Sequence, residues 1–220
     1  MSLSRLPPPE PPVFSGDPLL YAGWLAAFKT LIEGKGIPPR ERMHYLRRYL
    51  AGPAKEAVEG YFLISSDSAF DEAKAVLEQR YGNPFNVAEA FRNKLEGWPK
   101  VHPKDSQALR KFSDSLRQCE AAKKSIGSLR VLDDDRENRK LLMKLPDWLV
   151  KRWARIVADW RSKHGEYPPF RRFTEFVYQE SEIANDPVTG TFSKDQQALG
   201  QTQNVNKMIS RPKSLVLGVH

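Results

Sequence analysis

Apolar residues recur at helical spacing along most of the chain. The first run places Tyr21, Trp24, Phe28 and Leu31 on what would be one face of a helix. Further runs of this kind, bounded by proline and glycine, predict nine helices in all. Their approximate ranges are residues 17–33, 38–50, 54–62, 67–81, 84–95, 105–124, 134–145, 147–163 and 170–184. Because no stretch alternates as a strand would, the pattern predicts an all-α fold.

Prolines divide this pattern into parts. Residues 1–12 hold five prolines and predict an extended, mobile lead. A linker is expected at residues 99–103, because its two prolines cannot continue a helix. This linker would join a small N-terminal domain of five helices, residues 13–98, to a small C-terminal domain of four, residues 104–185. The polar residues 186–220 predict a disordered tail.

The start of the first helix gives the clearest local signal. Ser15-Gly16 forms a turn, and the carboxylate of Asp17 can accept hydrogen bonds from the first N–H groups of the helix. Pro18 suits the first helical position, where its missing N–H is not needed. The ordered first domain is therefore expected to begin just ahead of this helix, at Val13-Phe14.

Charge is distributed unequally over the 220 residues. Residues 1–102 carry 13 basic and 12 acidic groups, a net of +1, whereas residues 103–185 carry 18 and 13, a net of +5. A basic half of this kind is compatible with a polyanionic partner such as RNA. The candidate contacts are Lys151, Arg152, Arg155, Arg161, Lys163, Arg171 and Arg172. The simpler alternative is a solvated face whose long side-chain stems cover apolar surface.

The tryptophans of the predicted eighth helix have different expected roles. Trp153 and Trp160 belong to an apolar stripe with Leu149 and are expected to lie in the core. Trp148 lies off that stripe. It is the better candidate for an interface residue, because tryptophan is enriched at interaction hot spots.

No set of side chains predicts catalysis. Cys119, the single cysteine, lies on the apolar stripe of its helix and is expected to be a core thiol. Asp133-Asp134-Asp135 are better placed to favour a helix start than to converge on a cation. No Cys/His pair has zinc-ligand spacing, and no apolar run approaches the ~20 residues of a membrane span. We therefore expect no enzyme activity, cofactor, metal, small-molecule substrate or membrane span.

A set of residues spread along the chain forms a pattern of its own. The positions are residues 12–18 (PVFSGDP), Trp24, Phe28, Tyr45-Leu46, residues 50–54, Gly60, Ala73, Leu77, Arg80-Tyr81-Gly82, Lys144-Leu145-Pro146, Trp153 and residues 173–182. This pattern resembles the Gag polyprotein of long-terminal-repeat retrotransposons, closest to the BEL/Pao type. The resemblance extends over about residues 12–185. It is consistent with a capsid protein of such an element and with a domesticated host copy derived from one.

The resemblance implies a retroviral-capsid-like protein that self-assembles into a shell, a virus-like particle enclosing RNA. Its expected partners are RNA and further copies of itself, through a dimer of the C-terminal domain and higher oligomers. The alternative is a non-assembling helical adaptor or RNA-binding module derived from a Gag. A single cysteine fits a reducing compartment, and the particles are expected in the cytoplasm.

The resemblance also gives the segment before the first helix a candidate role. In related capsids this segment can mediate assembly contacts, so Phe14, Ser15, Gly16 and Asp17 are candidate assembly residues. We therefore predict that Phe14 packs on a domain surface. Removing residues 1–11 is expected to leave the fold intact, whereas Phe14→Ala is expected to weaken the fold or its assembly.

Overall fold

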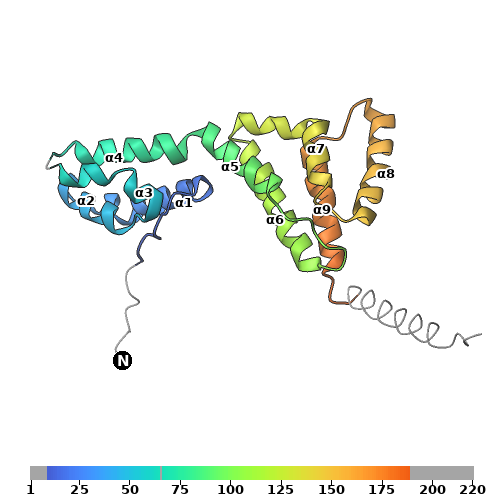
Figure 1. Cartoon of the computed structure of the whole chain (residues 1–220), viewed down its shortest axis with the longest axis horizontal. Helices are drawn as coiled ribbons and strands as arrows, with labels where there is room; N and C mark the ends of the chain where they lie inside the picture. The colour runs from blue at the N-terminus through green and yellow to red at the C-terminus, as the bar shows by residue number, and fades with distance from the viewer. Residues whose placement is uncertain (1–8, 65, 189–220) are drawn as a thin grey trace, which may run out of the picture. The chain divides into compact units, whose positions relative to one another are not determined.

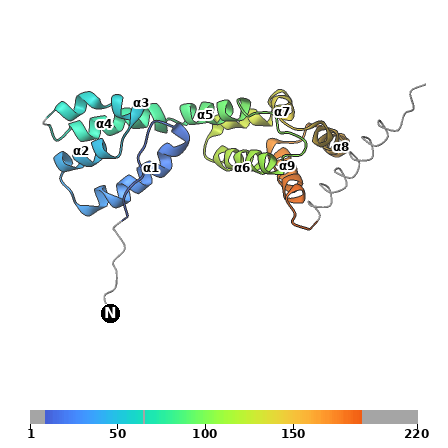
Figure 2. The ribbon, with the colours of Figure 1, turned by 60° about the horizontal axis from the view of Figure 1, so that its bottom comes forward.

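The computed structural model describes residues 9–64 and 66–188, and the regular structure of these residues is helical (Figures 1 and 2). The α-helices are α1 (Pro18–Leu31), α2 (Pro39–Arg48), α3 (Gly52–Glu56), α4 (Ala69–Leu77), α5 (Pro84–Glu96), α6 (Ser106–Lys123), α7 (Asp135–Leu142), α8 (Asp147–His164) and α9 (Phe170–Ala184). Shorter helical turns are η1 (Glu33–Lys35), η2 (Glu59–Leu63), η3 (Glu78–Gly82) and η4 (Gly127–Asp133). The prediction of an all-α fold is confirmed.

The chain divides into two compact units. Unit 1 contains the described residues up to Trp98 together with Ala121–Val131. Unit 2 contains Pro99–Glu120 and the described residues from Leu132 onward. The segment Ala121–Val131 thus groups with unit 1, although it lies within the predicted C-terminal domain. The domain boundaries proposed from the sequence stay predictions.

Both ends of the chain extend beyond the described part. The predicted mobile lead up to residue 8 and the predicted disordered tail from residue 189 lie outside the described residues. At the N-terminal side, Pro11 is buried, and the Glu10 carboxylate accepts a hydrogen bond from Arg48 at 3.3 Å. Contacts with unit 1 therefore begin upstream of the predicted domain start.

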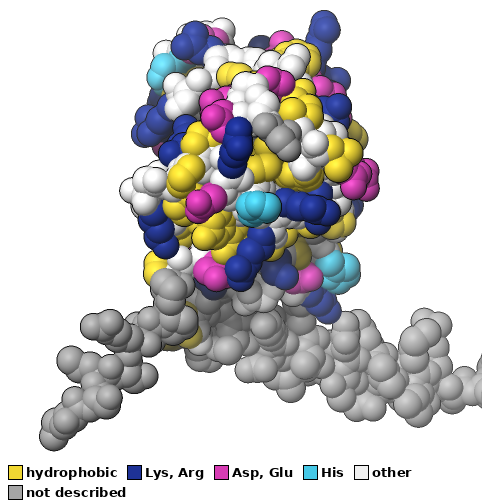
Figure 3. Space-filling view, turned by 90° about the vertical axis from the view of Figure 1, so that its left-hand side faces the viewer, with side chains coloured by type: hydrophobic (Ala, Val, Ile, Leu, Met, Phe, Trp, Pro, Cys, Tyr) yellow, Lys and Arg dark blue, Asp and Glu magenta, His cyan; other side chains and the backbone are white. Residues whose placement is uncertain are grey.

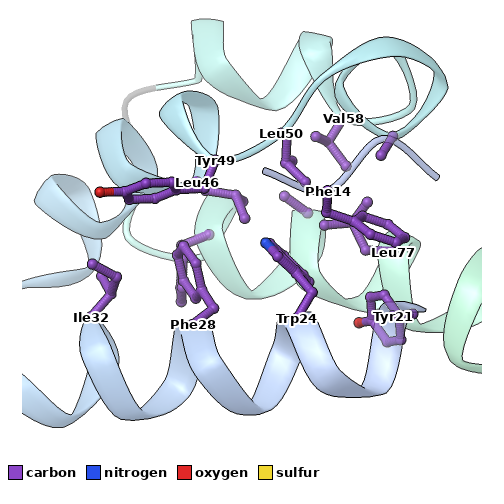
Figure 4. Close-up of a cluster of buried hydrophobic side chains, with 13 residues drawn as sticks. Phe14, Tyr21, Trp24, Phe28, Ile32, Leu46, Tyr49, Leu50, Val58 and Leu77 are labelled. Atoms are coloured by element: carbon purple, nitrogen blue, oxygen red, sulfur yellow. The ribbon is translucent and has the colours of Figure 1, made fainter. Parts of the chain in front are cut away.

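The core of unit 1 gathers around one face of α1. Tyr21, Trp24, Phe28 and Ile32 project from this face toward α2, α3 and α4, as Figure 4 shows. The remaining members of the buried cluster are Phe14, Leu46, Tyr49, Leu50, Ala54, Val58, Phe70, Ala73 and Leu77. The predicted cap of α1 is confirmed, since the backbone N–H of Leu19 donates to Asp17 Oδ1 at 2.9 Å. The helical spacing of the apolar residues therefore placed Tyr21, Trp24 and Phe28 correctly, whereas the predicted Leu31 is only partly covered and Ile32 is buried in its place.

Two helix predictions in unit 1 are wrong in their extent. The second helix ends at Arg48 rather than Leu50, because the chain leaves the helix after Arg48 and the backbones of Tyr49 and Ala51 form hydrogen bonds with Phe14. The third helix is not continuous: α3 stops at Glu56, and the 3-10 turn η2 takes over three residues later. Gly60, the second residue of η2, has a low preference for α-helix. The tighter turn still buries Val58 fully.

Gly82, the last residue of η3, is constrained by side-chain packing. Helix α4 runs on into the single π-helical turn η3, and Gly82 does not adopt the left-handed conformation of a helix-ending glycine. A Cβ atom at Gly82 would lie 2.7 Å from the side chains of Glu78 and Tyr21. Glycine is therefore required by close packing against α1, not by backbone conformation.

Helix α9 is the central helix of unit 2, with α6 on one side and α8 on the other (Figures 1 and 2). On the α6 side, the Arg117 guanidinium lies 4.3 Å from the centre of the Tyr178 ring. On the α8 side, the Trp153 ring contacts Phe173 and Phe176, with centroids 5.2 and 5.3 Å apart. The last predicted helix is thus the element that joins the others of this unit.

A buried polar chain crosses the core of unit 2. The indole N–H of Trp153 donates to the Tyr167 hydroxyl at 3.1 Å, and this hydroxyl donates to Asn138 Oδ1 at 2.7 Å. Asn138 is only 1% exposed. Buried polar groups are costly unless paired, so this chain fixes α7, α8 and the α8–α9 loop in one arrangement.

The three consecutive aspartates have separate partners. Asp134 caps α7 by accepting from the Arg136 N–H at 2.8 Å, and Asp133 accepts from the Phe170 N–H at 2.9 Å. Asp135 occupies the first helical position. The prediction that these residues favour a helix start is confirmed. Cys119 is fully buried, as expected for a core thiol.

Candidate interaction surfaces

Three surface features of the described residues bear on function: the segment 14–17, the exposed face of α8, and a pocket beside Trp148. On the end of unit 1 seen in Figure 3, basic, acidic and apolar side chains are interspersed. No group of three or more His, Cys, Asp and Glu residues in the described part is arranged to hold a metal ion. None of the described helices combines the length and the hydrophobicity of a membrane-spanning segment.

Phe14 closes the core of unit 1. Its side chain is 2% exposed, and its ring centroid lies 5.2 Å from those of Trp24 and Tyr81 and 5.5 Å from that of Tyr21. Its backbone N–H donates to the Tyr49 carbonyl, and its carbonyl accepts from the Ala51 N–H, both at 2.9 Å. The prediction that Phe14 packs on the domain is confirmed. The packing is deeper than a surface contact, so the side chain itself is not available to a partner.

The rest of the segment 14–17 forms the turn that delivers Phe14. Gly16 has φ +114°, a conformation that suits glycine, and a Cβ atom there would lie 3.3 Å from the Tyr81 side chain. Ser15 and Asp17 are exposed. Contacts to another molecule from this segment would therefore involve Ser15, Asp17 and the neighbouring Val13, which is 60% exposed.

Tyr21 lies beside the same turn and is ionisable but held neutral. Burial raises the pKa of its hydroxyl, and the neighbouring Glu78 carboxylate raises it further. The group is therefore an uncharged part of the core across the neutral range.

The seven basic candidates divide into paired and unpaired groups. Arg152 is the most firmly held, because its guanidinium donates to the buried Glu180 carboxylate at 2.9 Å. Lys163 pairs with Asp159 at 2.9 Å, and Arg171 and Arg172 share Glu175 at 2.9 and 3.5 Å. Within the described residues, Lys151, Arg155 and Arg161 have no ion-pair partner and are exposed. A polyanion would therefore bind these three side chains without having to displace a carboxylate from them.

The apolar stripe of α8 is less completely buried than the sequence indicates. Leu149 and Trp153 are buried, whereas Ile156, Val157 and Trp160 are only partly covered. The Trp160 ring stacks on His164, with centroids 4.0 Å apart. The expectation that Trp160 lies in the core is therefore wrong in degree, because the second half of α8 has fewer neighbours than the first.

Trp148 is exposed, as expected for a residue off the stripe. Its side chain is 38% exposed and forms one wall of a pocket of about 460 Å³ within unit 2. The other lining residues are Lys100, Val101, His102, Pro103, Pro146 and Asp147. We call this feature the Trp148 pocket.

Backbone contacts hold the Trp148 pocket together. The N–H of Val101 donates to the Lys144 carbonyl oxygen at 2.7 Å, and the Val101 side chain is 2% exposed. This contact fixes the proline-containing segment 99–103 against the turn between α7 and α8. Sequence periodicity did not reveal the pocket, because one wall comes from the non-helical segment 100–103 and the other from Pro146 and the first residues of α8, about 45 residues later, and no hydrophobic repeat relates the two.

Comparison with known proteins gives one family match. A model of the family described as Protein of unknown function (DUF1759) matches residues 14–159. This family is found in retrotransposon Gag/pol-like proteins. No curated protein and no solved structure matches the chain.

Proposed function

This chain belongs to the DUF1759 family, and from that membership we propose that it is a Gag-like structural protein that self-assembles into a capsid shell. The family match carries the proposal. It begins at Phe14, which completes the core of unit 1, and continues to residue 159 within α8 of unit 2. The matched region thus includes the core of one compact unit and most of the other.

The presence of two small units supports the same proposal. A closed shell needs heterologous contacts that generate rings and further contacts that join them. Two units that each have their own core can supply these contacts from different surfaces. We further propose that the element of origin is BEL/Pao-like or that the chain is a domesticated host copy. The proposal includes dimerisation through the C-terminal half and particles within the cytoplasm.

Size-exclusion chromatography with light scattering tests self-assembly directly. The expected result is a mass that rises with protein concentration, with closed particles in negative-stain images at high salt or with added RNA. A chain that stays monomeric at every concentration and in both conditions would contradict the proposal.

A second candidate function is RNA binding without assembly. It is favoured by one observation, the three exposed and unpaired cations Lys151, Arg155 and Arg161 on α8. Changing all three to Glu is expected to weaken RNA binding. It should also reduce the slope of log affinity against log salt by about 2, at ~0.7 per lost phosphate contact.

The matched control changes Lys35, Lys104 and Lys111 to Glu. These lysines are exposed and lie outside α8, so the net charge changes equally at other places. If both triple variants lower the affinity alike, the effect is one of net charge, and α8 is not the binding face.

A further inference from the structure

We propose that the Trp148 pocket of unit 2 binds the proline-rich residues 5–9 of a second copy of this chain. The inference rests on the proposed self-association and names one of its contacts. It follows from the chemistry of the pocket, from the composition of the lead, and from where the described chain begins.

The pocket has the chemistry of a site for a polyproline II helix. Such sites combine flat aromatic surfaces with apolar walls, onto which proline rings pack. Here the Trp148 indole provides the aromatic surface, and Val101, Pro103 and Pro146 provide the apolar walls. The volume of about 460 Å³ lies within the ~300–1,000 Å³ range of ligand pockets.

The pocket also offers donors to a backbone without internal hydrogen bonds. A polyproline II segment leaves its carbonyl oxygens free to accept. Within the described residues, the Trp148 indole N–H donates to no acceptor. His102 Nδ1 accepts from the Lys104 N–H at 3.3 Å, so the neutral ring carries its proton on Nε2 and can supply a second donor.

The lead is the proline run of this chain that remains available. Pro38-Pro39 and Pro168-Pro169 each stand at the start of a helix, α2 and α9. Pro11 is buried on unit 1. This leaves Pro7-Pro8-Pro9, of which Pro9 is exposed and is the first described residue.

Charge complementarity favours residues 5–9 over a proline run alone. Arg5 lies two positions before Pro7, and Asp147 is one of the residues that line the pocket. The Asp147 carboxylate is 89% exposed, and its pair with Lys100 is long, at 3.6 Å. An exposed pair of this kind contributes little stability and can exchange for a guanidinium.

Chain length allows the contact between two molecules. In a polyproline II conformation, residues 5–9 would span only about 12 Å, at ~3.1 Å per residue, so the pocket of the neighbouring molecule must lie close to this end of unit 1. Glu10 and Pro11 anchor the base of this segment on unit 1 of its own molecule. A lead anchored in this way on one molecule can reach the pocket of its neighbour.

The first arm of the test measures binding of a labelled peptide of residues 1–9 to the full chain by fluorescence anisotropy. We expect saturable binding that Trp148→Ala weakens about tenfold, as for a modest hot spot. The control Met143→Ala removes an apolar side chain that is 64% exposed and outside the pocket, and it should leave the affinity unchanged. A peptide with alanine at positions 7–9 should not bind. If the native peptide fails to bind, or if Trp148→Ala leaves its affinity unchanged, the proposal is overturned.

The second arm asks whether the natural occupant is another copy. Light scattering compares the full chain with its Pro7→Ala/Pro8→Ala/Pro9→Ala variant across concentration, and the variant is expected to need a higher concentration to associate. Unchanged association would overturn the second-copy assignment even if the peptide binds, and would leave the proposed capsid function standing. A native chain that never associates would instead contradict the proposed function and, with it, this contact.

Discussion

Units 1 and 2 both close their cores with a segment from one end of the unit, but they use different chemistry. In unit 1 the closing residue is Phe14, which three aromatic rings and two backbone hydrogen bonds hold in place. In unit 2 the closing element is α9, and a buried polar chain through Tyr167 fixes its neighbours. Unit 1 therefore depends on volume and close packing, whereas the core of unit 2 also depends on hydrogen bonds between its side chains. We therefore expect unit 1 to be destabilised by changes in side-chain volume, and unit 2 by the loss of a hydrogen-bonding group.

Removing the Phe14 ring should produce the largest effect. Phe14→Ala is expected to lower the free energy of unfolding by about 3–5 kcal/mol, because truncating a buried phenylalanine leaves a cavity. Urea unfolding followed by circular dichroism measures the change. The neighbouring Val13→Ala removes a side chain that is 60% exposed and should change stability by less than about 0.5 kcal/mol. Equal midpoints for the two variants would show that Phe14 does not close the core.

Adding a methyl group at Gly82 should be the next most harmful change. The new Cβ would lie 2.7 Å from Glu78 and Tyr21, so Gly82→Ala is expected to destabilise unit 1 by about 2 kcal/mol. The matched control is Gly60→Ala, where no atom lies within 4 Å of the added group. Thermal unfolding of both variants would sharpen the comparison. A loss of stability at Gly60 of the same size would point to backbone effects instead of packing.

Unit 2 should be most sensitive to the loss of one hydroxyl group. Tyr167→Phe leaves the Trp153 indole N–H and the Asn138 carbonyl oxygen without their shared partner, at an expected cost of about 1.5 kcal/mol. Tyr178→Phe serves as the control, because its ring packs against Arg117 while its hydroxyl forms no hydrogen bond within the described residues. Indistinguishable denaturation curves for these two variants would argue against a stabilising polar chain.

The smallest expected effect is a pH dependence of unit 2. Burial raises the pKa of Glu180, and the opposing effect of Arg152 is smaller. A carboxyl group with a raised pKa binds its proton more tightly in the folded state. Its contribution is therefore fully present below the ordinary pKa of 4.5 and is lost as pH rises through the folded-state value.

Glu180→Gln tests this sign. Subtracting the variant's stability from that of the native chain at each pH should give a difference that declines above pH 4.5. A difference that instead grows with pH would mean that Arg152 dominates over burial. Far-UV circular dichroism across urea gradients at several pH values gives the measurement.

Helical periodicity predicted the parts of the fold that single helices determine. The buried face of α1 and the Asp17 cap follow from spacing and local chemistry, and both are as expected. The wrong extent of the second helix arises where tertiary contacts override local preference, whereas the break in the third helix lies beside Gly60, a local signal that the hydrophobic spacing hid. Leu50 leaves the helix because the backbone beside it pairs with Phe14, which lies 36 positions earlier. No pattern within either segment indicates that pairing.

Candidate surface residues were predicted with uneven success. The exposure of Trp148 follows from its place off the apolar stripe. The sequence did not predict which basic residues lack an ion-pair partner. The pairing of Arg152, for example, depends on Glu180 in the next helix. The Trp148 pocket likewise needs the contact between Val101 and Lys144, which joins two non-helical segments. Contacts between side chains on different helices depend on tertiary packing, which local patterns in a single sequence do not predict.

Phe14 packs against a residue that is synthesised much later, and this has a consequence for folding during translation. Tyr81, which packs against the Phe14 ring, is synthesised 67 residues after it. Until then a nascent chain presents a Phe14 ring that lacks one of its three aromatic neighbours, to which chaperones can bind. A translational pause after Tyr81 has left the exit tunnel would therefore allow the aromatic cluster around Phe14 to form, whereas a pause before it would not.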